Sequence, residues 1–147
     1  CTVKGMQEGL TIGEVSGKLG MSSHTLRYYE RAGLLRPIPR TEGGIRRYQE
    51  QDVEMLRFLA RLRLMGMPIH QIREYAELAR SGRDTFEARG ELLTKHRSEV
   101  IARIEELQRN LEVLDLKIEM YSRGCTPLSA PGDPCAEKLR GLLERKN

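Results

Sequence analysis

A regular stripe of apolar residues in the second half of the chain limits the fold most strongly. Apolar residues recur there at alternating intervals of four and three, at Val100, Ile104, Leu107, Leu111, Leu114, Ile118 and Tyr121. This spacing places them on one side of a long helix, with Ile104, Leu111 and Ile118 at position a of a heptad repeat. A coiled-coil seam of about three heptads is therefore expected.

The seam predicts a homodimer. Burial of apolar surface stabilises by roughly 25 cal/mol per Å², so a narrow stripe with charged flanks favours pairing with a second copy. The alternative is that the stripe packs against the N-terminal half of its own chain. We expect this dimerisation helix over residues 84–123, because Asp84-x-x-Glu87 is a capping-box pattern and Gly124 ends it.

A helix-turn-helix is expected near the start of the chain. Thr11-x-x-Glu14 is a capping box, and Gly20 allows the tight turn that ends the first helix. Ser22 or Ser23 then caps a second helix that ends near residues 32–33. This second helix carries an arginine and two tyrosines in succession, a composition that suits the major groove of DNA. The residues are Arg27, Tyr28 and Tyr29.

The segment from Leu34 to Tyr48 is expected to form two short strands around a glycine turn at residues 43–44. Such a hairpin is either a β-wing that lies on a phosphate backbone or an ordinary surface hairpin. Arg46 and Arg47 follow the glycine turn, which favours the wing. Helices are expected next over residues 51–65 and 69–81.

The predicted fold is therefore mainly α, with a winged helix-turn-helix domain, a long coiled-coil helix and a short C-terminal loop and helix. The expected divisions are a leader over residues 1–9, a DNA-binding domain over 10–82, the dimerisation helix over 84–123 and a C-terminal effector segment over 124–147. That last segment contains a loop and then a short helix over 136–145.

The charge distribution agrees with a polyanionic partner at one end. Residues 24–47 hold six arginines and two glutamates, a balance of +4, whereas residues 99–119 hold six acids and three bases, a balance of −3.

No apolar run is long enough to span a membrane, so we expect a cytoplasmic protein. No phosphate loop or nucleophile elbow is present, and the histidines at 24, 70 and 96 are scattered, which argues against an enzyme. A structural coiled-coil adaptor is the other alternative.

Several of these residues together resemble the MerR family of bacterial transcription regulators. They are Leu26-Arg27-Tyr28-Tyr29-Glu30, Gly33-Leu34-Leu35, Arg40, Gly44-x-Arg46-x-Tyr48 and Asp52. The resemblance runs from about residue 10 to 121 and implies an antiparallel dimer that binds a dyad-symmetric promoter. It implies that the dimer distorts this DNA in response to an effector or stress signal and so acts on RNA polymerase indirectly. It also implies DNA contacts from Arg27, Tyr28, Tyr29, Arg40, Arg46 and Tyr48, and His24 and Thr25 are placed for the groove.

The sequence is compatible with two kinds of signal for such a regulator. Cys125 and Cys135 resemble the paired cysteines of copper- and zinc-sensing members, and close thiolates bind thiophilic metal ions. However, the loop holds no histidine, and Thr85-Phe86 stands where zinc- and mercury-type sensors supply a cysteine. The long helix is more similar to the branch linked to aldehyde and nitrosative stress, although Arg61 replaces the cysteine of that branch. A metal or thiol sensor and an organic-effector sensor are thus both compatible with the sequence.

Overall fold

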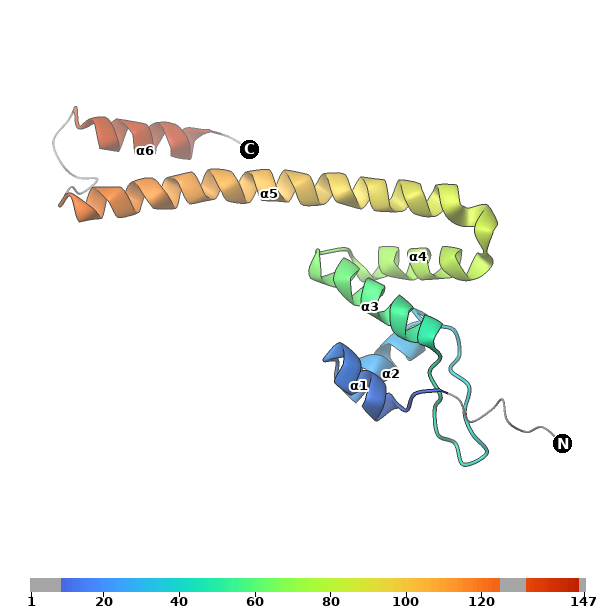
Figure 1. Ribbon diagram of the computed structural model, residues 1–147. Helices are drawn as coiled ribbons and strands as arrows, with labels where there is room; N and C mark the ends of the chain where they lie inside the picture. Colours follow the sequence, from blue (N-terminus) through green and yellow to red (C-terminus); the bar gives the residue numbers. More distant parts are fainter. Residues whose placement is uncertain (1–8, 125–131, 146–147) are drawn as a thin grey trace. The chain divides into compact units, whose positions relative to one another are not determined.

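The computed structural model describes residues 9–124 and 132–145, and its chain divides into two compact units, Cys1–His96 and Arg97–Asn147. The elements follow in the order α1 (Ile12–Leu19), α2 (Ser23–Arg31), α3 (Glu50–Leu64), α4 (Ile69–Ser81), a 3-10 turn η1 (Arg83–Thr85), α5 (Phe86–Ser122) and α6 (Pro134–Glu144) (Figure 1). The mainly helical fold expected from the sequence is thereby confirmed. None of the helices in the described ranges is both long and apolar enough to cross a membrane.

The helix-turn-helix forms as its capping residues predict. The Glu14 backbone N–H donates to the Thr11 hydroxyl at 3.3 Å, and the Thr11 N–H donates to the Glu14 carboxylate at 2.7 Å. Gly20 ends α1 with a φ of 64°, a left-handed conformation that glycine adopts without strain. Ser22 caps α2 by accepting the Thr25 N–H at 3.1 Å.

Removing the first cap will weaken the domain. Thr11→Ala should lower the free energy of unfolding by about 1 kcal/mol, because it leaves an N–H at the start of α1 without its acceptor. The hydrogen bond from the Thr11 backbone N–H is the main cause that lowers the pKa of Glu14, and alanine keeps that N–H. Urea unfolding of both proteins at neutral pH measures the effect of the lost hydroxyl group, and equal stability of the two proteins would contradict the prediction.

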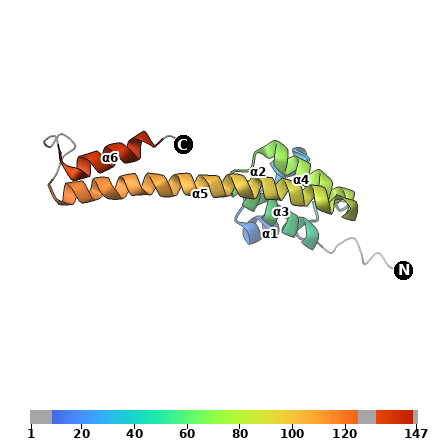
Figure 2. The same cartoon turned by 90° about the horizontal axis from the view of Figure 1, so that it is seen from above.

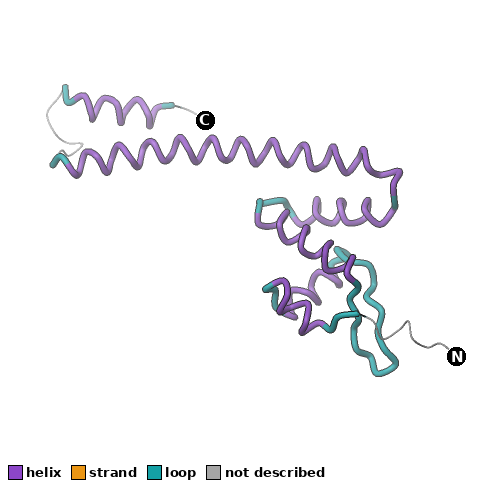
Figure 3. The backbone as a smooth tube through the Cα atoms, in the orientation of Figure 1, coloured by secondary structure: helices purple, strands orange, loops and turns teal. Residues whose placement is uncertain are grey.

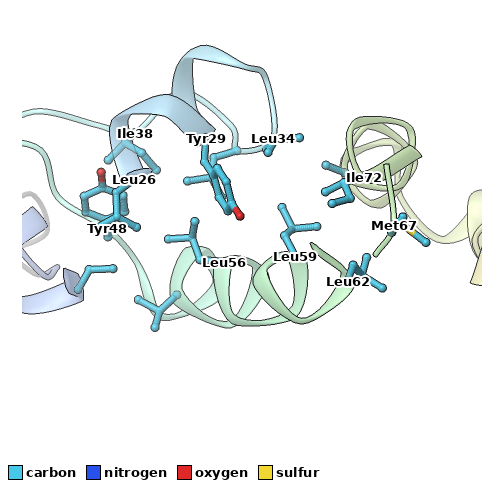
Figure 4. Close-up of a cluster of buried hydrophobic side chains, with 14 residues drawn as sticks. Leu26, Tyr29, Leu34, Ile38, Tyr48, Leu56, Leu59, Leu62, Met67 and Ile72 are labelled. Atoms are coloured by element: carbon cyan, nitrogen blue, oxygen red, sulfur yellow. The ribbon is translucent and has the colours of Figure 1, made fainter. Parts of the chain in front are cut away.

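The core of the first unit is built around α3. The inward-facing residues of α3 are all buried, namely Val53, Leu56, Leu59 and Leu62. From α2, Leu26 and Tyr29 pack against them, and Ile72 of α4 joins the same cluster (Figure 4). The core therefore holds α2 by one side, which leaves its other side facing solvent.

The hairpin between α2 and α3 differs from the expected pair of strands. Within the described residues it contains no strand (Figure 3): an isolated bridge joins Arg40 to Arg46, and a second joins Tyr48 at its end to Leu10, which precedes α1. The two prolines at 37 and 39 have no N–H to donate, so a continuous ladder cannot form along this arm. The turn itself is present, with Gly44 at a φ of 82° and its N–H donating to the Thr41 carbonyl at 2.9 Å.

Two other element boundaries also differ from the sequence-based expectation. Asp84 does not stand as the N-cap of the long helix but lies inside the η1 turn, and α5 begins at Phe86. The C-terminal helix begins at Pro134 rather than residue 136, because the Asp133 carboxylate caps it by accepting the Cys135 N–H at 2.9 Å. The loop expected at 124–135 lies largely outside the described residues, as do residues 1–8 of the expected leader.

In the second unit, α6 lies alongside the C-terminal half of α5 (Figures 1 and 2). Leu116 and Met120 of α5 are buried there against Leu139 of α6, with Val113 and Leu142 at the margin of the cluster. Leu116 occupies position f of the heptad frame, on the side of the helix opposite positions a and d. Within one chain, α6 thus covers the back of α5 and leaves the seam open.

Candidate nucleic-acid interface

Helix α2 has a buried face and an exposed face. Leu26 and Tyr29, three residues apart, point into the core, whereas His24, Arg27 and Tyr28 are exposed. The Tyr28 side chain is 39% exposed. Arg31 is exposed one turn beyond Arg27 and extends the same face. The outward side of α2 thus offers two guanidinium groups and a phenol to a partner.

Thr25 has a different environment from its neighbours on α2. It is half-buried, and its hydroxyl lies 2.9 Å from the Ser22 hydroxyl in the N-terminal cap. The Thr25 hydroxyl therefore belongs to the cap at the start of the helix. The Thr25 methyl group remains for an apolar contact with a partner.

The structure places two of the tyrosines expected to contact DNA, Tyr29 and Tyr48, in the core. Tyr29 is 2% exposed and Tyr48 is fully buried, and both belong to the core cluster (Figure 4). Burial is the main cause that raises the pKa of each phenol, so both stay neutral. The spacing of Tyr29 from Leu26, one turn of helix, was the sequence signal that could have identified it as a core residue.

The hairpin presents its two expected DNA-binding arginines differently. Arg40 is exposed, whereas Arg46, directly across the bridge, is mostly buried. The Arg46 Nε donates to the Glu30 carboxylate of α2 at 2.6 Å. Sequence reasoning placed Arg46 on the phosphate backbone and did not identify Glu30 as its partner.

A buried carboxylate fixes the segment that follows α2. Asp52 is 3% exposed and accepts two hydrogen bonds from Arg36, at 2.7 and 3.1 Å, in the fork geometry that suits a guanidinium. It also accepts the Gln49 N–H at 2.8 Å at the start of α3. The position of Asp52 in the first turn of a helix was visible in the sequence, but its partner sixteen residues earlier was not.

The end of α2 is held from α4 as well. Arg73 donates to the Ala32 carbonyl at 2.9 Å, and Arg80 donates to the Gly33 carbonyl at 3.0 Å. Carbonyl groups at a helix C-terminus carry partial negative charge and favour cations. These contacts fix the direction of α2 within the first unit.

The two cysteines near the C-terminus do not form a complete site in the described part of the chain. Cys125 lies outside the described residues, and Cys135 is a free, half-buried thiol in the first turn of α6. Among residues 9–124 and 132–145, no group of three or more histidine, cysteine or acidic side chains could hold a metal ion.

A helix with a solvent-facing basic and aromatic side, preceded by a tight turn and followed by an arginine-bearing hairpin, defines a helix-turn-helix DNA-binding protein. Two family models agree with this class: "MerR HTH family regulatory protein" matches residues 10–78, and "MerR, DNA binding" matches residues 53–116. The chain belongs to the MerR family of transcriptional regulators. Membership favours a DNA-binding regulator over a coiled-coil adaptor, and the family is one of regulators rather than enzymes.

Curated relatives show the same family. An uncharacterized HTH-type transcriptional regulator of Haemophilus influenzae is 35% identical over 113 residues, which cover 77% of this chain and 84% of that protein. The heavy metal-dependent transcription regulator 2 of Rhizobium meliloti is 38% identical over 108 residues, covering 71% of this chain and 74% of that protein. Regulators named for metal ions are therefore among the relatives.

Solved structures match both in sequence and in shape. A Listeria monocytogenes protein assigned to the MerR family of transcriptional regulators has a TM-score of 0.73 and 40% identity, with 94% of this chain and 100% of that chain covered. The structure of HiNmlR, a MerR family regulator lacking the sensor domain, bound to promoter DNA, has a TM-score of 0.69 and 35% identity. It covers 77% of this chain and 90% of that chain.

Proposed function

We propose that this protein binds a dyad-symmetric promoter as a homodimer, with one α2 helix in each of two successive major grooves. The division of α2 into a buried face and an exposed face carries this proposal. The core holds Leu26 and Tyr29, so the residues left to meet base edges and phosphates are His24, Arg27 and Tyr28. Thr25 contributes its methyl group at the start of the helix, and Arg40 reaches phosphate from the hairpin. Tyr29 and Tyr48 support these residues from the core.

The apolar seam of α5 supplies the dimer contact in this proposal. Its residues from 104 onward are between 49% and 65% exposed in the single chain, namely Ile104, Leu107, Leu111, Leu114, Ile118 and Tyr121, and Val100 is half-buried. Soluble chains rarely leave so long an apolar stripe in water. Because α6 covers the opposite side of α5, the seam is available to a second copy.

In this proposal, binding of the dimer bends or untwists the promoter DNA. Such a deformation of a site of about 20–30 base pairs costs on the order of 1–6 kcal/mol, and protein contacts on both half-sites can offset this cost. An effector that prefers one of two dimer arrangements would shift the DNA between two shapes and so act on RNA polymerase indirectly. We place this activity in the bacterial cytoplasm, where the promoter lies.

A gel-shift titration with the chain's own promoter region, repeated at several salt concentrations, tests the proposal. Affinity should fall steeply with salt, because phosphate contacts release counterions. It should also fall when one half of the dyad is scrambled. A chain that binds every duplex alike, or none at all, would be inconsistent with promoter recognition.

The two neighbouring tyrosines of α2 should respond differently to loss of the hydroxyl group. Tyr28→Phe should weaken promoter binding roughly tenfold, because it removes an exposed hydrogen-bonding group on the DNA-facing side. Tyr29→Phe should leave affinity within about twofold, since that hydroxyl group faces the core. Gel shifts at one fixed salt concentration compare the two variants, and the opposite order would place Tyr29 rather than Tyr28 at the DNA.

The signal is either a thiophilic metal ion held through Cys125 and Cys135, a thiol oxidation at the same pair, or an organic effector. Relatives named for heavy metals support the first of these signals. Elemental analysis of protein purified without chelator separates them, with Cys125→Ser as the control. About one metal ion per subunit that disappears in the variant would assign a metal sensor.

A further inference from the structure

An ion pair joins the DNA-reading helix to the hairpin. Glu30 lies in the last turn of α2 and Arg46 lies on the far arm of the hairpin, and their closest atoms are 2.6 Å apart. The two side chains are only 18% and 22% exposed. The pair is therefore better shielded from solvent than an ordinary surface ion pair.

The negative charge of a glutamate at this position is unfavourable for DNA binding unless a neighbouring cation offsets it. Glu30 follows Arg27 by three residues on a short helix, so its carboxylate lies one turn away from a proposed phosphate or base contact. An acid so close to a polyanion reduces affinity. The 2.6 Å contact with Arg46 neutralises that charge and uses one donor of the arginine.

The hairpin has few other restraints away from its base. At the base, Leu10 and Tyr48 exchange backbone hydrogen bonds of 2.8 Å, and the Tyr48 ring is buried. Towards the tip there are the bonds around Thr41 and Ile45 and the isolated bridge between residues 40 and 46. Ile38 in the core and the Arg36–Asp52 ion pair hold the first arm near its base, and without a strand ladder the part beyond them is oriented by side-chain contacts with α2.

We infer that Arg46 is a positioning residue, which holds the hairpin against α2 through Glu30 and so fixes where Arg40 meets the phosphate backbone. This inference rests on the proposed function, because it assumes that α2 and the hairpin contact the same duplex. It assigns to Glu30 a favourable role in DNA binding, although its charge is of the same sign as that of DNA.

Glu30→Gln tests the inference by the sign of its effect. If the pair positions the hairpin, the substitution weakens promoter binding about tenfold and also lowers the salt dependence, because Arg40 is no longer held at its phosphate. If Arg46 instead works by contacting phosphate, removing the carboxylate frees the arginine and binding becomes tighter. Glu42→Gln is the matched control: it removes one exposed acid from the same hairpin and should not weaken binding.

Arg46→Met provides the second arm of the test. A positioning role predicts that this variant weakens binding as much as Glu30→Gln, and that the double variant is no worse than either single one. A direct phosphate contact predicts instead that Arg46→Met weakens binding and lowers the salt slope by about one, while Glu30→Gln does neither. That pattern would overturn the inference.

Hydrogen exchange without DNA separates this inference from the proposed function. The amides of Thr41 and Gly44 are bonded within the hairpin. They should exchange several-fold faster in Glu30→Gln than in the wild type or in Glu42→Gln, while the amides of α3 stay protected. Equal hairpin exchange in all three proteins would refute the tether, whereas a wild type that binds no duplex would refute only the proposed function.

Discussion

Replacing Leu111 by glutamate should convert the protein into a monomer and abolish specific promoter binding. Leu111 lies at position a near the middle of the seam and is 54% exposed in the single chain. In a dimer its position would be buried, and an unpaired carboxylate placed there costs several kcal/mol. Because two linked half-site contacts gain far more affinity than one, we expect a loss of at least about a hundredfold. Sedimentation and gel shifts on the same samples measure both effects.

Ala102→Glu provides the matched control for this substitution. It also adds one carboxylate to an exposed position of α5, but at position f, on the side away from the seam. This variant should remain dimeric and bind the promoter with nearly wild-type affinity. A Leu111→Glu protein that still sediments as a dimer would show that a different surface holds the two copies together.

Local signals in the sequence were sufficient to locate most helices. Caps act over three or four residues, so Thr11, Gly20 and Ser22 could be identified from their immediate neighbours, and each has the expected role. The α5 helix and its open seam followed from a period that needs no knowledge of the rest of the chain. These features are local, and the structure confirms the helix that they predict.

Which of the expected site residues are exposed and which are buried could not be predicted from local signals. Tyr29 and Tyr48 have a polar hydroxyl group, which made a surface role reasonable, but their rings fill the core beside Leu26 and Leu56. Whether a tyrosine faces inward depends on which side of its helix the core covers, and that is a property of the tertiary structure. A resemblance at the motif level cannot separate residues that touch DNA from residues that support those contacts.

Ion pairs between distant segments were the other feature that the sequence could not reveal. Arg46 with Glu30, and Arg36 with Asp52, each join residues sixteen positions apart. A hairpin with prolines on one arm has no fixed register that would place such residues opposite one another. The number of arginines in this region therefore did not reveal that Arg36 and Arg46 are paired with carboxylates.

Arg27→Ala should have the second large effect, a loss of promoter affinity of roughly ten- to a hundredfold. Arg27 is exposed in the middle of α2, on the side opposite Leu26 and Tyr29, so its removal should not disturb the core. The salt dependence separates its two available roles. If Arg27 binds phosphate, the slope of log affinity against log salt falls by about one and all duplexes lose affinity equally. If it binds a base edge, the slope stays and discrimination between promoter and scrambled DNA shrinks.

Arg140→Ala is the control for net charge in this experiment. It removes the same charge from an exposed position of α6, outside the residues proposed to contact DNA, and should change affinity less than about twofold at physiological salt, which screens exposed charges that make no direct contact. If both variants lose affinity to the same extent, overall charge rather than the α2 face governs binding. If the Arg27→Ala variant binds with wild-type affinity, α2 contacts DNA through residues other than Arg27. The assignment of its exposed face must then be revised.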